Sequence, residues 1–270
     1  MKHRVKRCVS RHTDMSDSVV EQEIESPSVE FSLVCGVAPL KTMVSTIRQL
    51  SDDCIFTFTE DGVSASVVDS SHACLLFSHI PSANITDIQL EDEVQIAINL
   101  EALEGALKLG SKSDTVKLNL AHEGGALALD IGGLKKTIRL LDLSIVTNPP
   151  TPKIDLEFSS QVTSADFKKS VDAVKTVSEC AKLHYDGNAL TMTADSNMET
   201  VEAPLTMEAV HAGSEEATHT LLSTTFLTKM VKVLGESLTV SFGDKKPIKL
   251  QTNTDTLHFE WFLAPRITEN

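Results

Sequence analysis

The chain has 270 residues, of which 41% are hydrophobic, and it carries a formal net charge of −14 at pH 7. This is enough for two ordinary domains with buried cores, while every apolar run is far shorter than the roughly 20 residues that span a bilayer, so no membrane partner is expected. The five cysteines form no close pairs, which excludes a disulfide framework and C-x-x-C sites and fits a reducing cytosol.

Residues 1–28 are polar and show no apolar periodicity. Basic residues dominate their first half and acidic residues their second half. Such a composition predicts a disordered N-terminal extension, within which Met15 is an alternative start to Met1.

From Val29 onward the pattern predicts one strand, then a helix that begins at Pro39, then three strands. Asp61-Gly62 is a hairpin signal between the first two of these strands. A polar, acid-rich stretch follows, after which Asn99 caps a second helix. Three alternating strands complete this block.

A second block, which begins near Ile154, repeats the same order of elements. Asp61 and Asp186 are 125 residues apart, and Asn99 and Thr224 are separated by the same interval. This constant offset indicates an internal duplication. Within each half, the order strand, helix, three strands, helix, three strands suggests a smaller duplication inside the larger one.

The two blocks are joined by a proline-rich connector that contains Pro149, Pro150 and Pro152. Proline fixes φ and lacks an N–H donor, so no helix or central strand is expected from Thr147 to Lys153. The blocks are therefore predicted to be separate folding units joined by an extended strap. The expected division is an extension at 1–28, a first domain at 29–142, a connector at 143–153, a second domain at 154–267 and a tail at 268–270.

The best enzyme-like cluster is Asp69-Ser70-Ser71-His72, which would make the chain a hydrolase. Neighbouring strand residues point to alternate faces, whereas a Ser-His-Asp triad needs side chains that converge from separate elements. A turn with local Asp and Ser hydrogen bonds is the favoured interpretation. Gly124-Gly125 and Gly132-Gly133 lie within strand patterns and are read as turns or bulges. The histidines lack metal-ligand spacing, so we expect no catalytic residue, metal or cofactor.

The charge of the four predicted helices differs from that of the rest of the chain. Residues 39–50, 99–110, 163–177 and 224–235 together carry four net positive charges, which leaves eighteen net negative charges elsewhere. Solvated lysines on a helix are ordinary, but helices on one side of a continuous sheet would form one basic surface.

Three segments carry a resemblance to a known family: VDSSH at Val68–His72, IRLLDL at Ile138–Leu143 and FLAPRI at Phe262–Ile267. In this order they resemble motifs of proliferating cell nuclear antigen, the DNA sliding clamp of archaea and eukaryotes. The N-terminal extension, the short proline-rich connector and Phe262, where the family often has tyrosine, depart from its pattern. A damage-checkpoint clamp subunit has the same fold and is the alternative, although the motifs fit the replication clamp better.

The resemblance implies an α+β fold with two similar domains, whose helices lie on one face of antiparallel sheets that close into a trimeric ring. It implies a non-enzymatic processivity factor for DNA replication and repair, cytoplasmic in archaea or nuclear in eukaryotes. The implied partners are duplex DNA bound without sequence preference, a clamp loader, further copies in a trimer, and polymerases and other enzymes that dock short hydrophobic or aromatic peptides.

The resemblance and the charge pattern together suggest three sets of site residues. The expected DNA-facing cations are Lys41, Arg48, Lys108, Lys168, Lys169, Lys175, Lys229 and Lys232. The expected peptide pocket comprises His72, Leu143, Ile145, Val146, Pro247, Phe262, Ala264 and Pro265. The expected subunit contact pairs two free strand edges, 134–141 and 198–205, and includes Ile138, Leu140, Val201 and Ala203.

Overall fold

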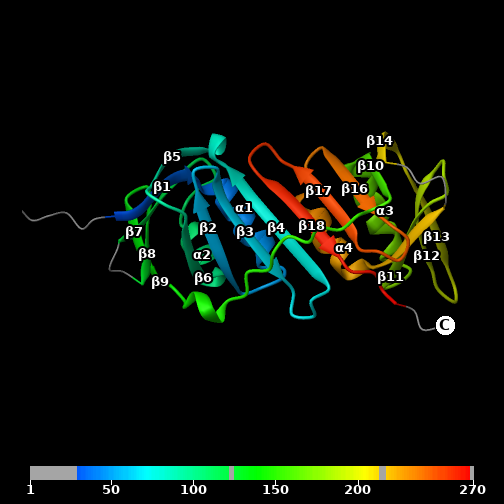
Figure 1. The fold of residues 1–270 in the computed structure, drawn as a ribbon, viewed down its shortest axis with the longest axis horizontal. Helices are drawn as coiled ribbons and strands as arrows, with labels where there is room; N and C mark the ends of the chain where they lie inside the picture. Colours follow the sequence, from blue (N-terminus) through cyan, green and yellow to red (C-terminus); the bar gives the residue numbers. More distant parts are fainter. Residues whose placement is uncertain (1–28, 122–124, 213–216, 268–270) are drawn as a thin grey trace, which may run out of the picture.

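The computed structural model describes residues 29–121, 125–212 and 217–267. The expected N-terminal extension and the tail at 268–270 lie outside these residues. The described part divides into two halves of the same construction, connected by a strap that crosses the front of the sheet in Figure 1. No described helix is long and apolar enough to cross a membrane.

The first half contains two helices and nine strands. These are β1 (Val29–Gly36), α1 (Val37–Ile47), β2 (Asp53–Thr59), β3 (Gly62–Val68), β4 (Cys74–Pro81), β5 (Ile85–Leu90), β6 (Val94–Asn99), α2 (Leu100–Leu107), β7 (Thr115–Ala121), β8 (Ala126–Ile131) and β9 (Leu134–Arg139).

The second half repeats this order. It contains β10 (Phe158–Thr163), α3 (Ser164–Val174), β11 (Cys180–Tyr185), β12 (Leu190–Asp195), β13 (Thr200–Leu205), β14 (Met207–Ala212), β15 (Thr218–Ser223), α4 (Thr224–Met230), β16 (Ser237–Phe242), β17 (Ile248–Asn253) and β18 (His258–Leu263).

The prediction of three strands between the two helices of each half was wrong, because the structure has five strands there. In the first half, β5 and β6 lie in the stretch that was read as polar. Strand β5 is at the edge of its sheet and buries no residue fully, so its alternation is weak. In the second half, the predicted strand METVEAPL (198–205) contains β13, and two further strands, β14 and β15, follow it.

The strands form sheets of five, nine and four strands. The nine-stranded sheet has the order β14-β10-β16-β17-β18-β4-β3-β2-β6 and runs through both halves. Its central seam is the antiparallel pair β4–β18, with Cys74 opposite Leu263 and His79 opposite His258. The expectation of separate folding units is therefore corrected: the halves share a sheet, and their buried residues form one hydrophobic cluster.

The four helices pack on one side of the nine-stranded sheet, behind it in Figure 1. Helix α1 contacts α2, and α3 contacts α4. Each helix buries an apolar stripe and leaves its polar stripe exposed, as the helical spacing predicts. The helical face of the molecule is consequently the face on which the predicted cations lie.

The helix ends differ slightly from the predicted ones. Helix α1 begins at Val37, so Pro39 lies in its first turn, where its missing N–H costs nothing. Asn99 caps α2 as predicted, because its side chain accepts the N–H of Ala102 at 3.1 Å. The position equivalent to Asn99 in α4 is Ser223, not Thr224, and Ser223 makes no side-chain cap bond.

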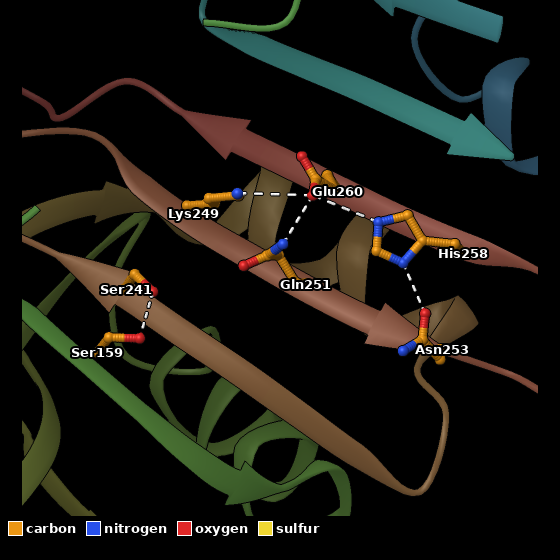
Figure 2. A network of polar contacts seen from close by, with 7 residues as sticks. All are labelled: Ser159, Ser241, Lys249, Gln251, Asn253, His258 and Glu260. Atoms are coloured by element: carbon orange, nitrogen blue, oxygen red, sulfur yellow. Dashed lines mark hydrogen bonds and ion pairs between the residues drawn. The ribbon is translucent and has the colours of Figure 1, made fainter. Parts of the chain in front are cut away.

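The opposite face of the nine-stranded sheet is polar where β10, β16, β17 and β18 meet. Figure 2 shows Glu260 of β18 accepting from Gln251 at 2.7 Å and lying 3.5 Å from the Lys249 ammonium. His258 contacts Asn253 at 2.6 Å in the same network. This face is therefore polar, and it carries both positive and negative side chains.

Candidate DNA-facing helices, partner pocket and subunit edges

The structure places all eight predicted cations on or just after the helices, on their polar stripes. Lys168 and Lys169 lie on α3, Lys41 lies on α1, and Lys232 follows α4. Among the described residues these four form no ion pair. They are therefore the cations most available to an external anion.

The other four predicted cations have partners within the chain. The Arg48 guanidinium pairs with the Glu104 carboxylate, which also lies 3.3 Å from the Lys108 ammonium. Lys175 pairs with Asp172 on its own helix. The polar neighbourhood of the helices is therefore less positive than a count of their lysines and arginines suggests.

Lys229 has a structural role that its sequence position does not reveal. Its ammonium donates to the Gln49 carbonyl oxygen at 2.7 Å and lies 5.1 Å from the centre of the Phe226 ring. Gln49 follows the C-terminus of α1, where free carbonyls favour a cation. Lys229 thus joins the helical layers of the two halves, opposite the β4–β18 seam.

The Asp69–His72 segment is a tight turn between β3 and β4. Asp69 Oδ1 accepts the N–H groups of Ala73 at 2.8 Å and Cys74 at 2.6 Å, and its Oδ2 accepts the N–H of Ser71 at 2.8 Å. Ser71 Oγ also donates to Oδ2. Because of this turn, His72 adopts a left-handed φ of 56°.

This geometry supports the turn interpretation over the hydrolase interpretation. The Asp69 carboxylate is occupied by backbone N–H groups and by Ser71, so it does not orient a histidine. In the hydrogen bonds formed by the described residues, the His72 ring contacts neither Ser70 nor Ser71. The role of Asp69 is to hold the turn that presents His72 at the surface.

We expect Asp69→Asn to lower the free energy of unfolding by about 2 kcal/mol at pH 7, because it weakens charge-assisted hydrogen bonds. Burial by itself raises the pKa of Asp69, but the hydrogen bonds from Ser71, Cys74 and Ala73 outweigh it and hold the pKa below its ordinary value. This stabilisation is present above the unfolded-state pKa and is lost as the pH falls through the folded-state pKa.

Urea unfolding at pH 7 and at pH 3 measures this effect. The difference between wild type and Asp69→Asn should shrink on acidification, because the pH then falls below the unfolded-state pKa of the carboxyl and toward its lower folded-state pKa. Asp155→Asn, at an exposed connector position, is the matched control and should change little at either pH. A difference that stayed constant with pH would mean that the Asp69 charge does not stabilise the turn.

A cavity of about 470 Å³ lies between the connector and the end of the β4–β18 seam. It is lined mainly by apolar side chains, which come from the β3–β4 region, the connector prolines and the C-terminal segment. The lining residues are Val68, His72, Ala73, Leu75, Thr147, Asn148, Pro149, Pro150, Pro152, Ile154, Pro247, Phe262 and Ala264.

The connector is anchored over this cavity by few contacts. Ser66 Oγ of β3 donates to the Pro149 carbonyl oxygen at 2.7 Å. From Val146 to Glu157 the chain forms neither helix nor strand, as the prolines predict. On the other side of the cavity, Ala264 donates its N–H to the Ala73 carbonyl at 2.8 Å.

The predicted pocket residues do not all line the same cavity. His72, Pro247, Phe262 and Ala264 line the cavity, whereas Ile145 and Val146 line a neighbouring cavity of about 240 Å³ that also includes His72. Leu143, 44% exposed, and Pro265 line neither. Leu75, Ile154 and the connector prolines line the cavity but were not predicted to do so, although the prolines were identified as the extended part of the strap.

Two of the free strand edges lie where they were expected. Strand β9 is the last strand of the five-stranded sheet, and β13 is the last strand of the four-stranded sheet. Leu140 donates its N–H to the Gly125 carbonyl at 2.8 Å. In an antiparallel pair, every second residue of a strand donates its N–H to the neighbouring strand. The N–H of Ile138 therefore also points to β8, whereas the N–H groups of Lys135, Thr137 and Arg139 point to the free edge.

Strand β13 shows the same alternation of inward and outward N–H groups. Ser196 donates to the Glu199 carbonyl at 2.8 Å, so the N–H groups of Val201 and Ala203 point inward to β12. The backbone polar groups of Thr200, Glu202 and Pro204 point to the free edge. Pro204 therefore occupies a position where no inward donor is lost. Of the predicted contact residues, Ile138 is buried, while Leu140, Val201 and Ala203 are half-buried.

The described residues contain no cluster of three or more His, Cys, Asp or Glu side chains that could hold a metal ion. The buried thiols of Cys35, Cys54 and Cys74 have pKa values raised chiefly by desolvation, so they are poor nucleophiles.

Comparisons with known proteins agree with this architecture. Residues 30–145 match the family model described as proliferating cell nuclear antigen, N-terminal domain. The DNA polymerase sliding clamp 1 of Thermococcus kodakarensis is 27% identical over 247 residues, which cover 87% of this chain and 97% of that protein. The DNA polymerase sliding clamp of Thermoplasma acidophilum is 22% identical over 245 residues, covering 87% and 98%.

Solved structures of proliferating cell nuclear antigens superpose over most of the chain. A. fulgidus PCNA, in a structure with the C-terminal region of FEN-1 bound, gives a TM-score of 0.82 at 21% identity, covering 89% of this chain and 100% of that one. PCNA from Entamoeba histolytica gives 0.78 at 17% identity, covering 89% and 100%. The chain therefore has the sliding-clamp fold and is similar to DNA polymerase sliding clamps over most of its length, with residues 30–145 matching the N-terminal domain of proliferating cell nuclear antigen.

Proposed function

We propose that this chain is a subunit of a sliding clamp, a non-enzymatic processivity factor that encircles duplex DNA and tethers polymerases and other replication and repair enzymes. The observation that carries the proposal is the position of the four helices. They lie on one side of the sheets and expose cations there, although the chain as a whole carries a net charge of −14.

Ring closure follows from the strand edges. An unpaired edge is a template for another strand, and a head-to-tail contact between two different edges makes a ring when the rotation closes. The free edges β9 and β13 lie in the five-stranded sheet of the first half and the four-stranded sheet of the second. Three copies in a ring, with the helices inside, would bring the cations to the DNA.

Because a closed ring encircles the DNA, its basic lining need not bind DNA tightly. A ring cannot dissociate sideways, so its contacts with phosphate need only be weak and independent of sequence. The internal pairing of Arg48 and Lys108 with Glu104 fits this requirement, because it limits the attraction and permits sliding.

The cavity beside the connector is proposed to receive partner peptides. Its apolar lining suits hydrophobic and aromatic anchors, and its proline-rich wall limits the entropy lost on docking. A relative has been solved with the C-terminal region of FEN-1 bound, and we extend that mode of tethering to this chain.

A linear duplex with one end fixed to a bead tests the proposal without a clamp loader. The protein is incubated with the open duplex, the free end is then blocked, and the beads are washed in high salt. A ring that has threaded over the end should stay only on blocked duplexes. Equal retention on open and blocked duplexes would mean ordinary electrostatic binding and would contradict the proposal.

Replacing Lys41, Lys168, Lys169 and Lys232 with alanine should weaken DNA binding at low salt. Each lost phosphate contact should lower the magnitude of the slope of log K against log salt by about 0.9. A salt titration of duplex binding measures this slope.

The matched control removes the same number of charges from exposed positions outside the helices, by replacing Lys112, Lys117, Lys153 and Lys182 with alanine. The control should retain the wild-type slope. If the two variants behaved alike, the helical cations would serve only solubility.

A further inference from the structure

The turn between β16 and β17 is held firmly against β15. Lys245 donates its N–H to the His219 carbonyl oxygen at 2.9 Å, and Thr220 Oγ1 donates to the Lys246 carbonyl oxygen at 2.8 Å. Thr220 is fully buried, so the turn is tied to the core of the second half. The turn ends at Pro247, which lines the cavity beside the connector. This part of the cavity wall is therefore fixed by the packing of the second half.

The same turn also holds the end of the connector. The Lys246 ammonium pairs with the Glu157 carboxylate and donates to the Asp155 carbonyl oxygen at 3.1 Å. Asp155 directly follows Ile154, and Lys246 directly precedes Pro247. Both Ile154 and Pro247 line the cavity. One lysine side chain thus bridges two segments that each contribute to the cavity wall.

Gly243, which begins the turn, leaves room for this contact. A Cβ atom at Gly243 would lie 2.8 Å from Glu157 Cδ and 2.8 Å from Lys246 Cδ, which is well inside van der Waals contact. Gly243 is not among the glycines with a positive φ, so no unusual backbone conformation explains it. Glycine is needed here because any side chain would displace Glu157 and Lys246.

The contact between Lys246 and Glu157 is supported from both sides. The hydrogen bond from Lys246 is the main reason why the pKa of Glu157 lies below its ordinary value. A single exposed ion pair contributes little, but the backbone of Lys246 is held as well. Its N–H donates to the Gly243 carbonyl oxygen at 3.1 Å, and its carbonyl oxygen accepts from Thr220. Less conformational freedom is therefore lost when the side chain pairs.

We infer that Gly243, Lys246 and Glu157 form a clasp that positions the end of the connector and keeps the cavity in the shape that receives partner peptides. Lys246 is a positioning residue, because it lies outside the cavity lining and acts through its neighbours. The inference rests on the proposed function and deepens it, since it identifies what regulates the affinity of that cavity.

The clasp is the second of two anchors of the connector. The first is the hydrogen bond from Ser66 Oγ to the Pro149 carbonyl oxygen. Between the anchors lie Pro150, Pro152 and Ile154, which line the cavity. A segment tied at both ends loses little freedom when a peptide docks. Opening the clasp frees one end, so docking must then order it, and the bound peptide should leave faster.

The affinity and dissociation rate of a labelled peptide from the C-terminal region of an archaeal FEN-1 test the inference on the full chain. Lys246→Met and Glu157→Gln should each weaken binding about threefold, mainly through faster dissociation. Gly243→Ala should weaken binding about tenfold, because its Cβ displaces both partners. Lys246→Arg keeps a charged donor and should bind nearly as wild type does.

Two matched controls separate the clasp from the loss of a charge and from the replacement of a glycine. Lys153→Met removes a charge from an exposed position of the same connector, where Lys153 forms no ion pair with the part of the chain that the structure describes. Gly125→Ala adds a Cβ where no other atom lies within 4 Å. Both controls should bind the peptide as wild type does.

A double-mutant cycle shows whether the two side chains act together. Lys246→Met combined with Glu157→Gln should weaken binding no more than either change alone, because both remove the same contact. Fully additive losses would overturn the clasp. Both side chains are partly exposed, so these variants should keep the wild-type unfolding midpoint and decide the matter even if Gly243→Ala does not fold.

The clasp and the proposed function fail in different ways. Tight peptide binding by wild type that Lys246→Met and Glu157→Gln leave unchanged would overturn the clasp and leave the function of the cavity intact. A wild-type chain that binds no peptide would overturn the proposed role of the cavity and the clasp with it. Retention on blocked DNA measures the clamp function independently of both.

Discussion

Replacing Ala264 with glutamate should reduce the affinity for a partner peptide about a hundredfold, which corresponds to roughly 3 kcal/mol. Ala264 is exposed and lines the cavity beside the connector. A carboxylate there would be desolvated by the apolar anchors of a docking peptide and would find no lysine or arginine to pair with in the cavity lining. Calorimetry with a peptide from the C-terminal region of an archaeal FEN-1 measures this loss.

The matched control is Leu143→Ser, because Leu143 was predicted to belong to the pocket but lines neither cavity. This variant should bind the peptide nearly as tightly as wild type. If Leu143→Ser abolished binding while Ala264→Glu did not, the peptide would dock on the first turn of the connector and not in the cavity. Both variants should keep the wild-type unfolding midpoint, since both positions are exposed.

Thr137→Pro should convert the assembly to single chains or pairs. The Thr137 N–H points to the free edge, so proline removes one donor of the intersubunit ladder without breaking the β8–β9 hairpin. Ile138→Pro, which the position of the strand alone would suggest, is a poorer test because the Ile138 N–H points to β8. Light scattering at several concentrations measures the loss of mass.

Thr137→Val is the control for this prediction, because it keeps the backbone donor and the β-branched shape. It should retain the wild-type mass. A Thr137→Pro chain that still assembled, with its hairpin intact by circular dichroism, would mean that subunits do not meet through β9.

Much of the fold was predictable because it rests on local patterns. The repeated Asp-Gly turns appear as Gly62 with φ 134° and Gly187 with φ 96°, both conformations that favour glycine. The prolines predicted the connector, and the ends of the sheets were predicted at β9 and β13. Four strands were missed. Strands β5 and β14 bury little, so their alternation is weak, whereas β6 and β15 bury several residues but lie next to polar stretches that were read as loops.

The rest could not be read from local sequence, since it depends on contacts between distant residues. Arg48 and Glu104 meet only because α1 packs against α2, and Lys229 reaches Gln49 only because the two halves share a sheet. The cavity likewise combines Leu75, Ile154 and Ala264 from three separate segments. Sequence spacing identifies a cationic helix or an apolar strap. It does not show which charges are already paired within the chain or which side chains line the same cavity.

Negative-stain images of the purified chain show directly whether it forms a ring. We expect closed rings of three copies with a central hole wide enough for duplex DNA. Compact particles without a hole, at concentrations where the wild-type chain has reached its full assembled mass, would contradict it.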